Sequence, residues 1–153
     1  MRRSMLTSIA AFLGARRGSA AIEFSIAAPV MAAIFVPLID LGMGLYRQMQ
    51  VQDAAQAGAQ YAMAHGWNGS AIQSAVTGAT ALTVSATPAP SKACGCPSEG
   101  AIAAAACGAA CPDGRAAGTY VTVGAQATYN TLLPYPALGS SVTLSAQATA
   151  RIQ

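Results

Sequence analysis

The 153-residue chain contains little charge and few aromatic residues: charged side chains make up 8% of it and aromatic ones 6%. Hydrophobic residues reach 54% and the mean hydropathy is +0.43, which is unusually apolar for a soluble protein. We therefore expect part of the chain to contact lipid. Much of the apolar fraction is alanine, so a soluble core built from the remainder would be thin and would need cross-links or partners.

A basic surface is also lacking, although the net charge is +3. Half of the eight basic residues precede Gly18, namely Arg2, Arg3, Arg16 and Arg17. After Gly18, four basic residues stand against five acidic ones. The basic excess therefore indicates membrane topology and not polyanion binding, and we predict neither a nucleic-acid partner nor a small-molecule substrate.

Catalytic signatures are missing as well. His65 is the single histidine of the chain, and no nucleophile motif accompanies it. We predict that the chain is not an enzyme, that it has no catalytic residues and no cofactor, and that His65 lies in the last turn of a helix ended by Gly66.

The longest uncharged stretch near the amino terminus is FSIAAPVMAAIFVPLI, between Glu23 and Asp40. At 1.5 Å per residue it is shorter than the roughly 20 residues that cross a bilayer core. The predicted transmembrane helix therefore extends over residues 19–46, includes both acids and ends at an interfacial Tyr46. Lipid cannot satisfy backbone groups, so a helix is the expected form.

The arginines ahead of this helix predict a single-pass protein of the bacterial inner membrane, with a cytoplasmic amino terminus and a periplasmic or extracellular carboxyl-terminal domain. A secretory signal peptide would need a small-residue cleavage site after its apolar region, where the sequence instead reads PLIDLG. A twin-arginine signal would need apolar consensus residues where GSAAIE follows Arg16 and Arg17. An uncleaved anchor and a prepilin-type leader are the two remaining interpretations.

Three residues favour the prepilin-type leader. The basic segment 1–18 ends in Gly18, a small residue follows at Ser19, and Glu23 is the fifth residue after the glycine, where the apolar helix opens. Together with residues 20–62, AAIEFSIAAPVMAAIFVPLIDLGMGLYRQMQVQDAAQAGAQYA, this pattern resembles the TadE-like family of tight-adherence (Flp) pilus systems. The sequence departs from the family at Gly58-Ala59-Gln60-Tyr61, where a basic residue usually precedes the tyrosine.

The resemblance implies a minor pilin-like component, or pseudopilin, that takes part in pilus assembly and surface adhesion. It implies cleavage after Gly18 by a prepilin peptidase, and partners among the other pilin-like subunits and the pilus assembly machinery. The hypothesis from another class is an uncleaved single-pass scaffold or binding module of the cell envelope. An amino terminus that begins before Gly18 in the mature protein would favour this second hypothesis.

The leader has a physical rationale of its own. Cleavage would create an amine on Ser19, one helical turn from Glu23, and during assembly the glutamate could pair with the amine of a neighbouring subunit. At about 4 Å and an effective dielectric constant near 20, this attraction amounts to about 4 kcal/mol before desolvation. The alternative is a Glu23 that lies solvated among lipid headgroups.

Beyond Tyr46 we expect an exported helical segment, residues 47–81. Glutamines recur every four residues and form a polar stripe: Gln48, Gln52, Gln56 and Gln60. Small residues form another face, at Ala54, Gly58 and Ala62, which suits close helix packing. Together with Glu23 and Pro29, these three positions are candidates for packing between subunits. Packing of the same face on the chain's own sheet is the alternative.

A short second helix is predicted after a turn at Asn68-Gly69. Ser70 and Gln73 have the spacing of a capping box, and four residues are expected to face inward. These are Ile72, Ala75, Val76 and Ala79.

Residues 82–153 are predicted to form an antiparallel sheet. Apolar residues alternate with polar ones at 82–87, 120–129 and 142–152, which indicates three half-buried strands covered by the long helix. Residues 130–141 are expected to form a proline-stiffened loop. The predicted fold is therefore α+β and pilin-like.

The cysteines fall in a predicted loop, residues 88–118, at Cys94, Cys96, Cys107 and Cys111. A zinc site is disfavoured because the C-x-C half lacks the usual spacing and no histidine is near, so we predict no metal. Cys94 and Cys96 are too close to pair with each other, so each is expected to form a disulfide with Cys107 or Cys111, in either arrangement. Closing such a loop contributes about 3 kcal/mol.

Overall fold

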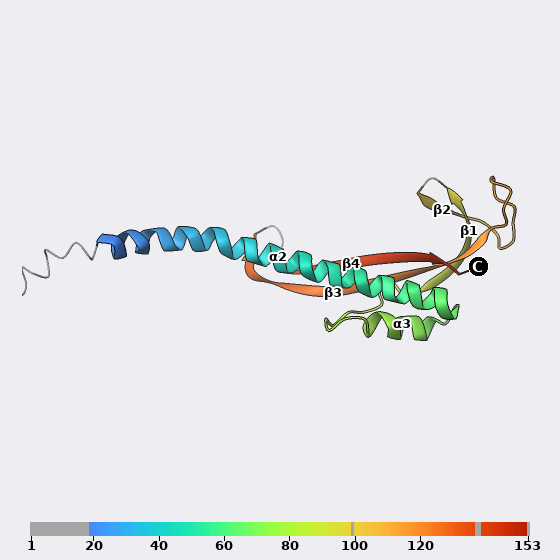
Figure 1. Cartoon of the computed structure of the whole chain (residues 1–153), viewed down its shortest axis with the longest axis horizontal. Helices are drawn as coiled ribbons and strands as arrows, with labels where there is room; N and C mark the ends of the chain where they lie inside the picture. The colour runs from blue at the N-terminus through green and yellow to red at the C-terminus, as the bar shows by residue number, and fades with distance from the viewer. Residues whose placement is uncertain (1–18, 99, 137–138, 153) are drawn as a thin grey trace, which may run out of the picture. The chain divides into compact units, whose positions relative to one another are not determined.

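The structure is a computed structural model that describes residues 19–98, 100–136 and 139–152. The predicted leader, including the cleavage position Gly18, lies outside the described residues. Figure 1 shows the elements in chain order. They are α2 (Ser19–His65), α3 (Gly69–Thr77), β1 (Ser91–Ser98), β2 (Ala101–Ala104), β3 (Gly118–Tyr135) and β4 (Gly139–Arg151). The α+β class is confirmed, and the described residues divide into two units between Ile39 and Asp40.

The first unit is the amino-terminal part of α2, residues 19–39, in which large apolar side chains are exposed. Seven of them are more than half exposed: Ile22, Phe24, Ile26, Val30, Ile34, Leu38 and Ile39. The helix continues through Pro29 and Pro37 and is long and apolar enough to cross a membrane. At 1.5 Å per residue, residues 19–39 extend for about 32 Å, close to the ~30 Å hydrocarbon core of a bilayer.

In the second unit, the part of α2 that follows Asp40 runs along the β3–β4 hairpin (Figure 1). Its inward residues are spaced three and four apart, which places them on one side of the helix. They are Val51, Ala54, Ala55, Ala59 and Ala62, none more than 5% exposed. They form the core with Val121, Val123, Ala125 and Ala127 of β3 and with Ile72 and Val76 of α3.

The predicted glutamine stripe lies away from this core along most of its length. Gln52, Gln56 and Gln60 are exposed, whereas Gln48 is half-buried. The Gln48 side-chain amide donates a hydrogen bond of 2.9 Å to the backbone carbonyl of Ser145 on β4. The first glutamine of the stripe therefore helps to hold α2 against the sheet.

The sheet has the strand order β2-β1-β3-β4 and is antiparallel throughout. The prediction of three strands was wrong, because β1 and β2 lie inside the segment 88–118 that we expected to be a loop. β1 pairs with the start of β3, from Ser91 opposite Thr122 to Gly95 opposite Gly118. β2 is an edge strand and β1 lies between β2 and β3, but both strands are mostly exposed and need no apolar alternation, so the period-2 pattern does not reveal them.

The predicted strand 82–87 is also corrected. It forms one isolated bridge, in which Ser85 and Gln126 exchange backbone hydrogen bonds of 2.8 and 2.9 Å. The predicted burial holds, with Val84 buried and the side chains of Leu82 and Ala86 half-buried. Pairing stops here because Pro88 follows and has no N–H to donate.

Helix α3 starts two residues earlier than predicted, because its N-cap is not Ser70. Its N-cap is Asn68, whose side chain accepts the backbone N–H of Ala71 at 3.2 Å, while the Ser70 hydroxyl also donates to Asn68. Ile72 and Val76 are buried as predicted. Ala75 is half-buried, and Ala79 is exposed because the helix ends before it.

The predicted loop 130–141 is largely part of a long hairpin. β3 extends to Tyr135 and β4 begins at Gly139, with an irregular register between Asn130 and Tyr135. Prolines favoured the loop prediction, yet Pro134 is tolerated because the pairing is already irregular there.

Candidate functional site

The amino-terminal end of α2 carries the residues that the leader prediction singled out. The described part of α2 starts at Ser19, and Glu23 lies one turn further with an exposed side chain. Residues four apart lie on the same side of a helix. An amine formed on Ser19 would therefore lie within one helical turn of the Glu23 carboxylate. Pro29 is exposed two turns later, within the apolar unit.

The small-residue face of α2 packs against its own chain. Ala54 and Ala62 are fully buried, and a Cβ added at Gly58 would lie 2.6 Å from Cγ2 of Val76 and 2.8 Å from Cγ1 of Val123. At Gly58, α2 therefore closely approaches both α3 and β3. Because the chain itself covers these three positions, the structure supports the alternative of packing on the chain's own sheet, and we do not retain them as a contact between subunits.

A polar site that the sequence analysis missed lies at Asp40. This side chain is only 2% exposed, whereas the sequence placed Asp40 inside the predicted membrane helix and identified no donor for it. The Tyr129 hydroxyl donates to Oδ1 of Asp40, and the Leu132 backbone N–H donates to Oδ2 at 3.1 Å. Both donors come from β3, so the carboxylate joins α2 to the hairpin and is satisfied where it is buried.

The carboxylate also changes the acidity of two tyrosines. The pKa of Tyr129 is raised above its ordinary value of 10.0, first because its hydroxyl donates to Asp40 and second because burial disfavours the phenolate. Burial, and then a hydrogen bond to Asp40, raises the pKa of Tyr135. Both tyrosines therefore remain neutral hydrogen-bond donors at physiological pH.

A cavity of about 270 Å³ lies beside Tyr129. Its lining is mainly apolar, and Arg47 supplies its one charged side chain. Arg47 therefore lies on the hairpin side of α2, seven residues after Asp40, and its charge slightly opposes the rise in the pKa of Tyr129. No group of three metal-ligating side chains occurs among the described residues.

The comparisons with known proteins identify the amino-terminal segment. Residues 18–60 match the family model described as TadE-like protein. This segment is a TadE-like domain. Comparison with curated proteins and with solved structures produced no match.

The TadE-like domain begins at Gly18 and includes both Glu23 and Asp40. It covers the apolar unit and most of the remaining α2, and it ends before α3 and the sheet. The family implies a pilin-like protein associated with the Tad pilus, and such pilin families are generally non-enzymatic. Within the described ranges, one helix is long and apolar enough to cross a membrane, which is consistent with a membrane anchor or a pilin-type helix.

The cysteines lie outside the TadE-like domain and form two disulfides, Cys94–Cys107 and Cys96–Cys111. The structure thus selects one of the two arrangements that the sequence left open. The Cα atoms are 5.1 and 5.6 Å apart, within the usual range for a disulfide. Both bridges join β1 to the segment that links β2 to β3, so they hold this linking segment to the sheet.

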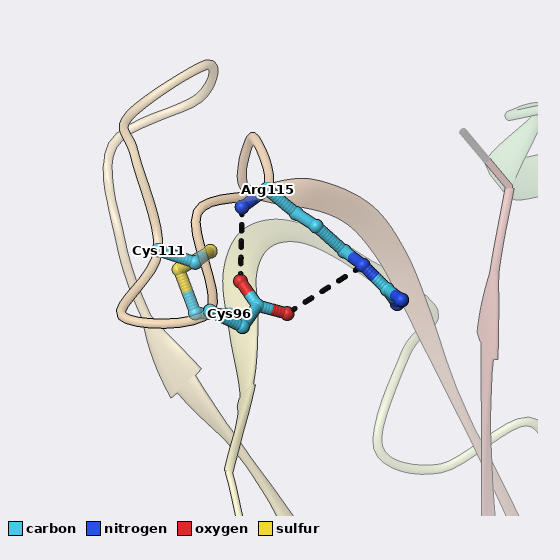
Figure 2. Close-up of a disulfide and its surroundings, with 4 residues drawn as sticks. Cys96, Cys111 and Arg115 are labelled. Carbon is cyan, nitrogen blue, oxygen red and sulfur yellow. Dashed lines mark hydrogen bonds and ion pairs between the residues drawn. A yellow bond between two sulfur atoms is a disulfide. The ribbon is translucent and has the colours of Figure 1, made fainter.

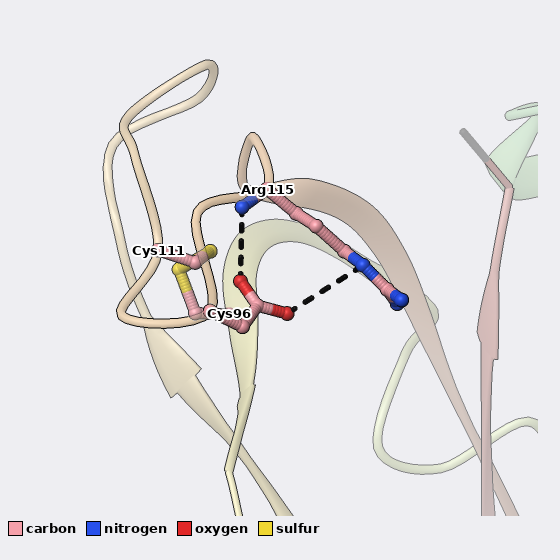
Figure 3. A network of polar contacts seen from close by, with 4 residues as sticks. Cys96, Cys111 and Arg115 are labelled. Atoms are coloured by element: carbon pink, nitrogen blue, oxygen red, sulfur yellow. Dashed lines mark hydrogen bonds and ion pairs between the residues drawn. A yellow bond between two sulfur atoms is a disulfide. The ribbon is translucent and has the colours of Figure 1, made fainter.

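Figure 2 shows the Cys96–Cys111 bridge with Arg115 beside it. The chain turns back after Cys111, whose backbone N–H donates to the carbonyl of Arg115 at 2.7 Å. The contacts dashed in Figure 3 join Arg115 to the carboxylate of Asp113. The Arg115 backbone N–H donates to Oδ1 at 3.1 Å, and the Arg115 Nε forms an ion pair with Oδ2 at 3.9 Å. The two side chains are 76% and 40% exposed, so the ion pair adds little stability and the disulfide holds the turn.

His65 ends α2 as predicted. Its ring stacks on Tyr61 with centroids 4.4 Å apart, and its Nδ1 lies 3.3 Å from the Tyr61 carbonyl. Gly66 follows with φ of 78°, and its N–H donates to the Ala62 carbonyl at 2.9 Å. This is the left-handed geometry in which glycine ends a helix.

Proposed function

We propose that the chain is a minor pilin-like (pseudopilin) component of a tight-adherence type IV pilus, and that it takes part in pilus assembly and surface adhesion. The observation that carries this proposal is the TadE-like match, which begins at Gly18 and includes Glu23. One feature of the structure supports it. Seven large apolar side chains of residues 22–39 are more than half exposed on the long helix, as a lipid-contacting or pilin-type helix requires.

The proposed mechanism begins with a prepilin peptidase that cuts after Gly18 in the membrane. The new amine on Ser19 pairs with Glu23 of a neighbouring subunit when subunits assemble. The pair forms at low dielectric, where leaving one member of a buried pair unpartnered costs roughly 3–5 kcal/mol. This penalty would select the axial position at which neighbouring helices pack.

In this proposal the cytoplasmic arginines orient the chain, and the second unit lies on the periplasmic or extracellular side of the inner membrane. The two disulfides support this orientation, because disulfides persist in oxidising compartments. The partners are the prepilin peptidase, other pilin-like subunits and the pilus assembly machinery.

The test is mass spectrometry of the amino-terminal peptide of the membrane-bound protein, from cells with and without the prepilin peptidase. We expect the peptide to begin at Ser19 when the peptidase is present and to retain residues 1–18 when it is absent. A peptide that begins before Gly18 in both strains would contradict the proposal and favour an uncleaved membrane-anchored scaffold.

A further inference from the structure

We propose that the described part of the β3–β4 hairpin tip, residues 132–136 with Leu132 and Leu133 at its surface, inserts into the outer lipid surface of the membrane beside α2. The proposal rests on the membrane anchoring described above and adds a second lipid-contacting element to it. The occupant of this surface is therefore the phospholipid of the anchoring membrane.

The first argument is the level at which the hairpin tip is held. The backbone N–H of Leu132 donates to Oδ2 of Asp40 at 3.1 Å. Asp40 follows Ile39, the last residue of the exposed apolar unit. The contact therefore fixes Leu132 at the point of α2 where that unit ends.

The second argument is the chemistry of the tip. The side chain of Leu132 is 56% exposed and that of Leu133 is 42% exposed, and Pro134 and Pro136 are exposed beside them. Residues 116–150 contain no charged residue in the sequence. Adjacent exposed leucines on an uncharged hairpin would be unfavourable in water, whereas they suit the boundary between headgroups and acyl chains.

The third argument is that α2 remains apolar beyond the level of the tip. Leu41, Leu45 and Met49 lie on one side of the helix and are 62%, 59% and 54% exposed. Interfacial residues follow at Tyr46 and Arg47, six and seven positions after Asp40. At 1.5 Å per residue, Tyr46 lies about 9 Å along the helix from Asp40. A membrane surface near Tyr46 would therefore cover the hairpin tip.

The fourth argument is the way in which Asp40 is shielded. Its two carboxylate oxygens accept hydrogen bonds from the Tyr129 hydroxyl and the Leu132 backbone, and the side chain is 2% exposed. An acid at a lipid boundary needs such internal donors, whereas one in water could be solvated directly. The hairpin thus both shields the acid and presents two leucines outward.

The test measures quenching of tryptophan fluorescence by brominated phosphatidylcholine in vesicles that contain the full chain at low protein density. The native Trp67 is first replaced by phenylalanine, and one tryptophan is then placed at Leu133. A matched control places it at Ile102 on β2, which is 41% exposed against 42% for Leu133. A positive control places it at Phe35, within the apolar unit.

We expect Leu133→Trp fluorescence to fall by about half, most strongly with bromine on the upper acyl chain, as for side chains inserted 5–10 Å. We expect Phe35→Trp to be quenched and Ile102→Trp to be unaffected. Quenching of Phe35→Trp without quenching of Leu133→Trp would overturn the hairpin proposal and leave the anchor intact. Absence of quenching at both positions would overturn the membrane anchor and the hairpin proposal together.

A second variant guards against misfolding. Leu132→Trp keeps the backbone N–H that donates to Asp40 and is expected to be quenched like Leu133→Trp. Formation of both disulfides and an unchanged circular dichroism spectrum would show that each variant is folded. Equal quenching of a folded Ile102→Trp variant and the Leu133→Trp variant would also overturn the proposal, because lipid contact would then not be specific to the tip.

Discussion

Tyr129 on β3 donates its hydroxyl hydrogen to the carboxylate of Asp40, which lies 89 residues earlier on α2. The contact lies within the second unit and joins the part of α2 that begins at Asp40 to β3. It also explains how an acid directly after the apolar unit is buried, because the phenol and a backbone N–H supply its hydrogen bonds.

The first prediction concerns this hydrogen bond. Tyr129→Phe keeps the ring but leaves Oδ1 of Asp40 without its donor, so we expect the free energy of unfolding to fall by about 2 kcal/mol, as for hydrogen bonds to charged groups. Thermal or denaturant unfolding of the full chain in detergent micelles measures the change. Tyr120→Phe, nine residues earlier on the same strand, is the control and should change stability little. Equal loss in the two variants would contradict the assigned role of Tyr129.

The second prediction concerns alkaline pH. Because the folded chain raises the pKa of Tyr129 above 10.0, the unfolded chain loses this proton at lower pH than the folded chain. The stabilisation is therefore fully present below the unfolded pKa of about 10 and is lost as pH rises through the folded pKa. In that pH window the wild type should lose its higher free energy of unfolding relative to Tyr129→Phe, because a phenolate would face Asp40. A stability difference that stays constant from pH 8 to pH 11.5 would contradict the coupling.

The third prediction compares two glycines of α2. Gly58→Ala places a methyl group less than 3 Å from the side chains of Val76 and Val123, which are fully buried and stiff. Overpacking costs about 1–3 kcal/mol, which outweighs the ~1 kcal/mol that alanine contributes to a helix. We therefore expect Gly58→Ala to lower the unfolding temperature. Gly42→Ala is the matched control, because a Cβ there meets nothing within 4 Å, and it should leave that temperature unchanged or raise it.

The fourth prediction concerns the disulfide pairing. Trypsin cuts after Lys92 and Arg115, so all four cysteines fall in one tryptic peptide and paired variants have to reveal the connectivity. Replacing Cys94 and Cys107 together with serine should leave one disulfide and no free thiol, because Cys96 and Cys111 remain bonded. Replacing Cys94 and Cys111 together should leave two free thiols. A thiol titration under denaturing conditions distinguishes these results, and the opposite pattern would contradict the observed pairing.

The same variants measure the energetic contribution of the bridges. The bonded cysteines are 13 and 15 residues apart in sequence. Loops of this size contribute about 3 kcal/mol each in the chain-entropy model. Replacing one bonded pair, either Cys94 with Cys107 or Cys96 with Cys111, should therefore lower the free energy of unfolding by a similar amount. A negligible loss would mean that the pairing of β1 with β3 holds this region without the disulfides.

The elements that were predictable from the sequence are those with long, regular patterns. The helix that ends at His65 followed from apolar and small residues at helical spacing, and the β3–β4 pairing followed from strict alternation around Val121 and Val123. β1 and β2 escaped prediction because SKACGCPS and AIAA form mostly exposed strands, in which side-chain burial imposes no pattern. The disulfides that cross-link this region were also not assigned, because composition does not show which cysteines pair.

The Asp40 site shows a second limit. The acid was visible in the sequence, but its donors at Tyr129 and Leu132 lie 89 and 92 residues away and follow no local spacing. An acid so close to an apolar segment signalled that a donor was needed. The uncharged aromatic residues of 129–135 were the available signal for where that donor would come from.

The fifth prediction concerns the amino-terminal residues that carry the proposed function. Gly18→Leu should block removal of residues 1–18, so the membrane-bound protein should keep its full mass while membrane insertion proceeds. Glu23→Ala should be cleaved normally but assemble poorly, because the amine on Ser19 of a neighbouring subunit would lose its partner. At about 4 kcal/mol before desolvation, that loss would reduce assembly well over tenfold. Amino-terminal mass spectrometry and counts of pili on cells measure the two effects separately.

Ser25→Ala is the matched control for Glu23→Ala, because it alters another exposed polar side chain within the same turns of α2 and changes no charge. It should be cleaved and should support normal pilus formation. If Glu23→Ala cells form pili as abundantly as Ser25→Ala cells, the carboxylate has no role in subunit pairing. If Gly18→Leu is still cut to begin at Ser19, the peptidase does not require the glycine, and the leader interpretation loses its sequence basis.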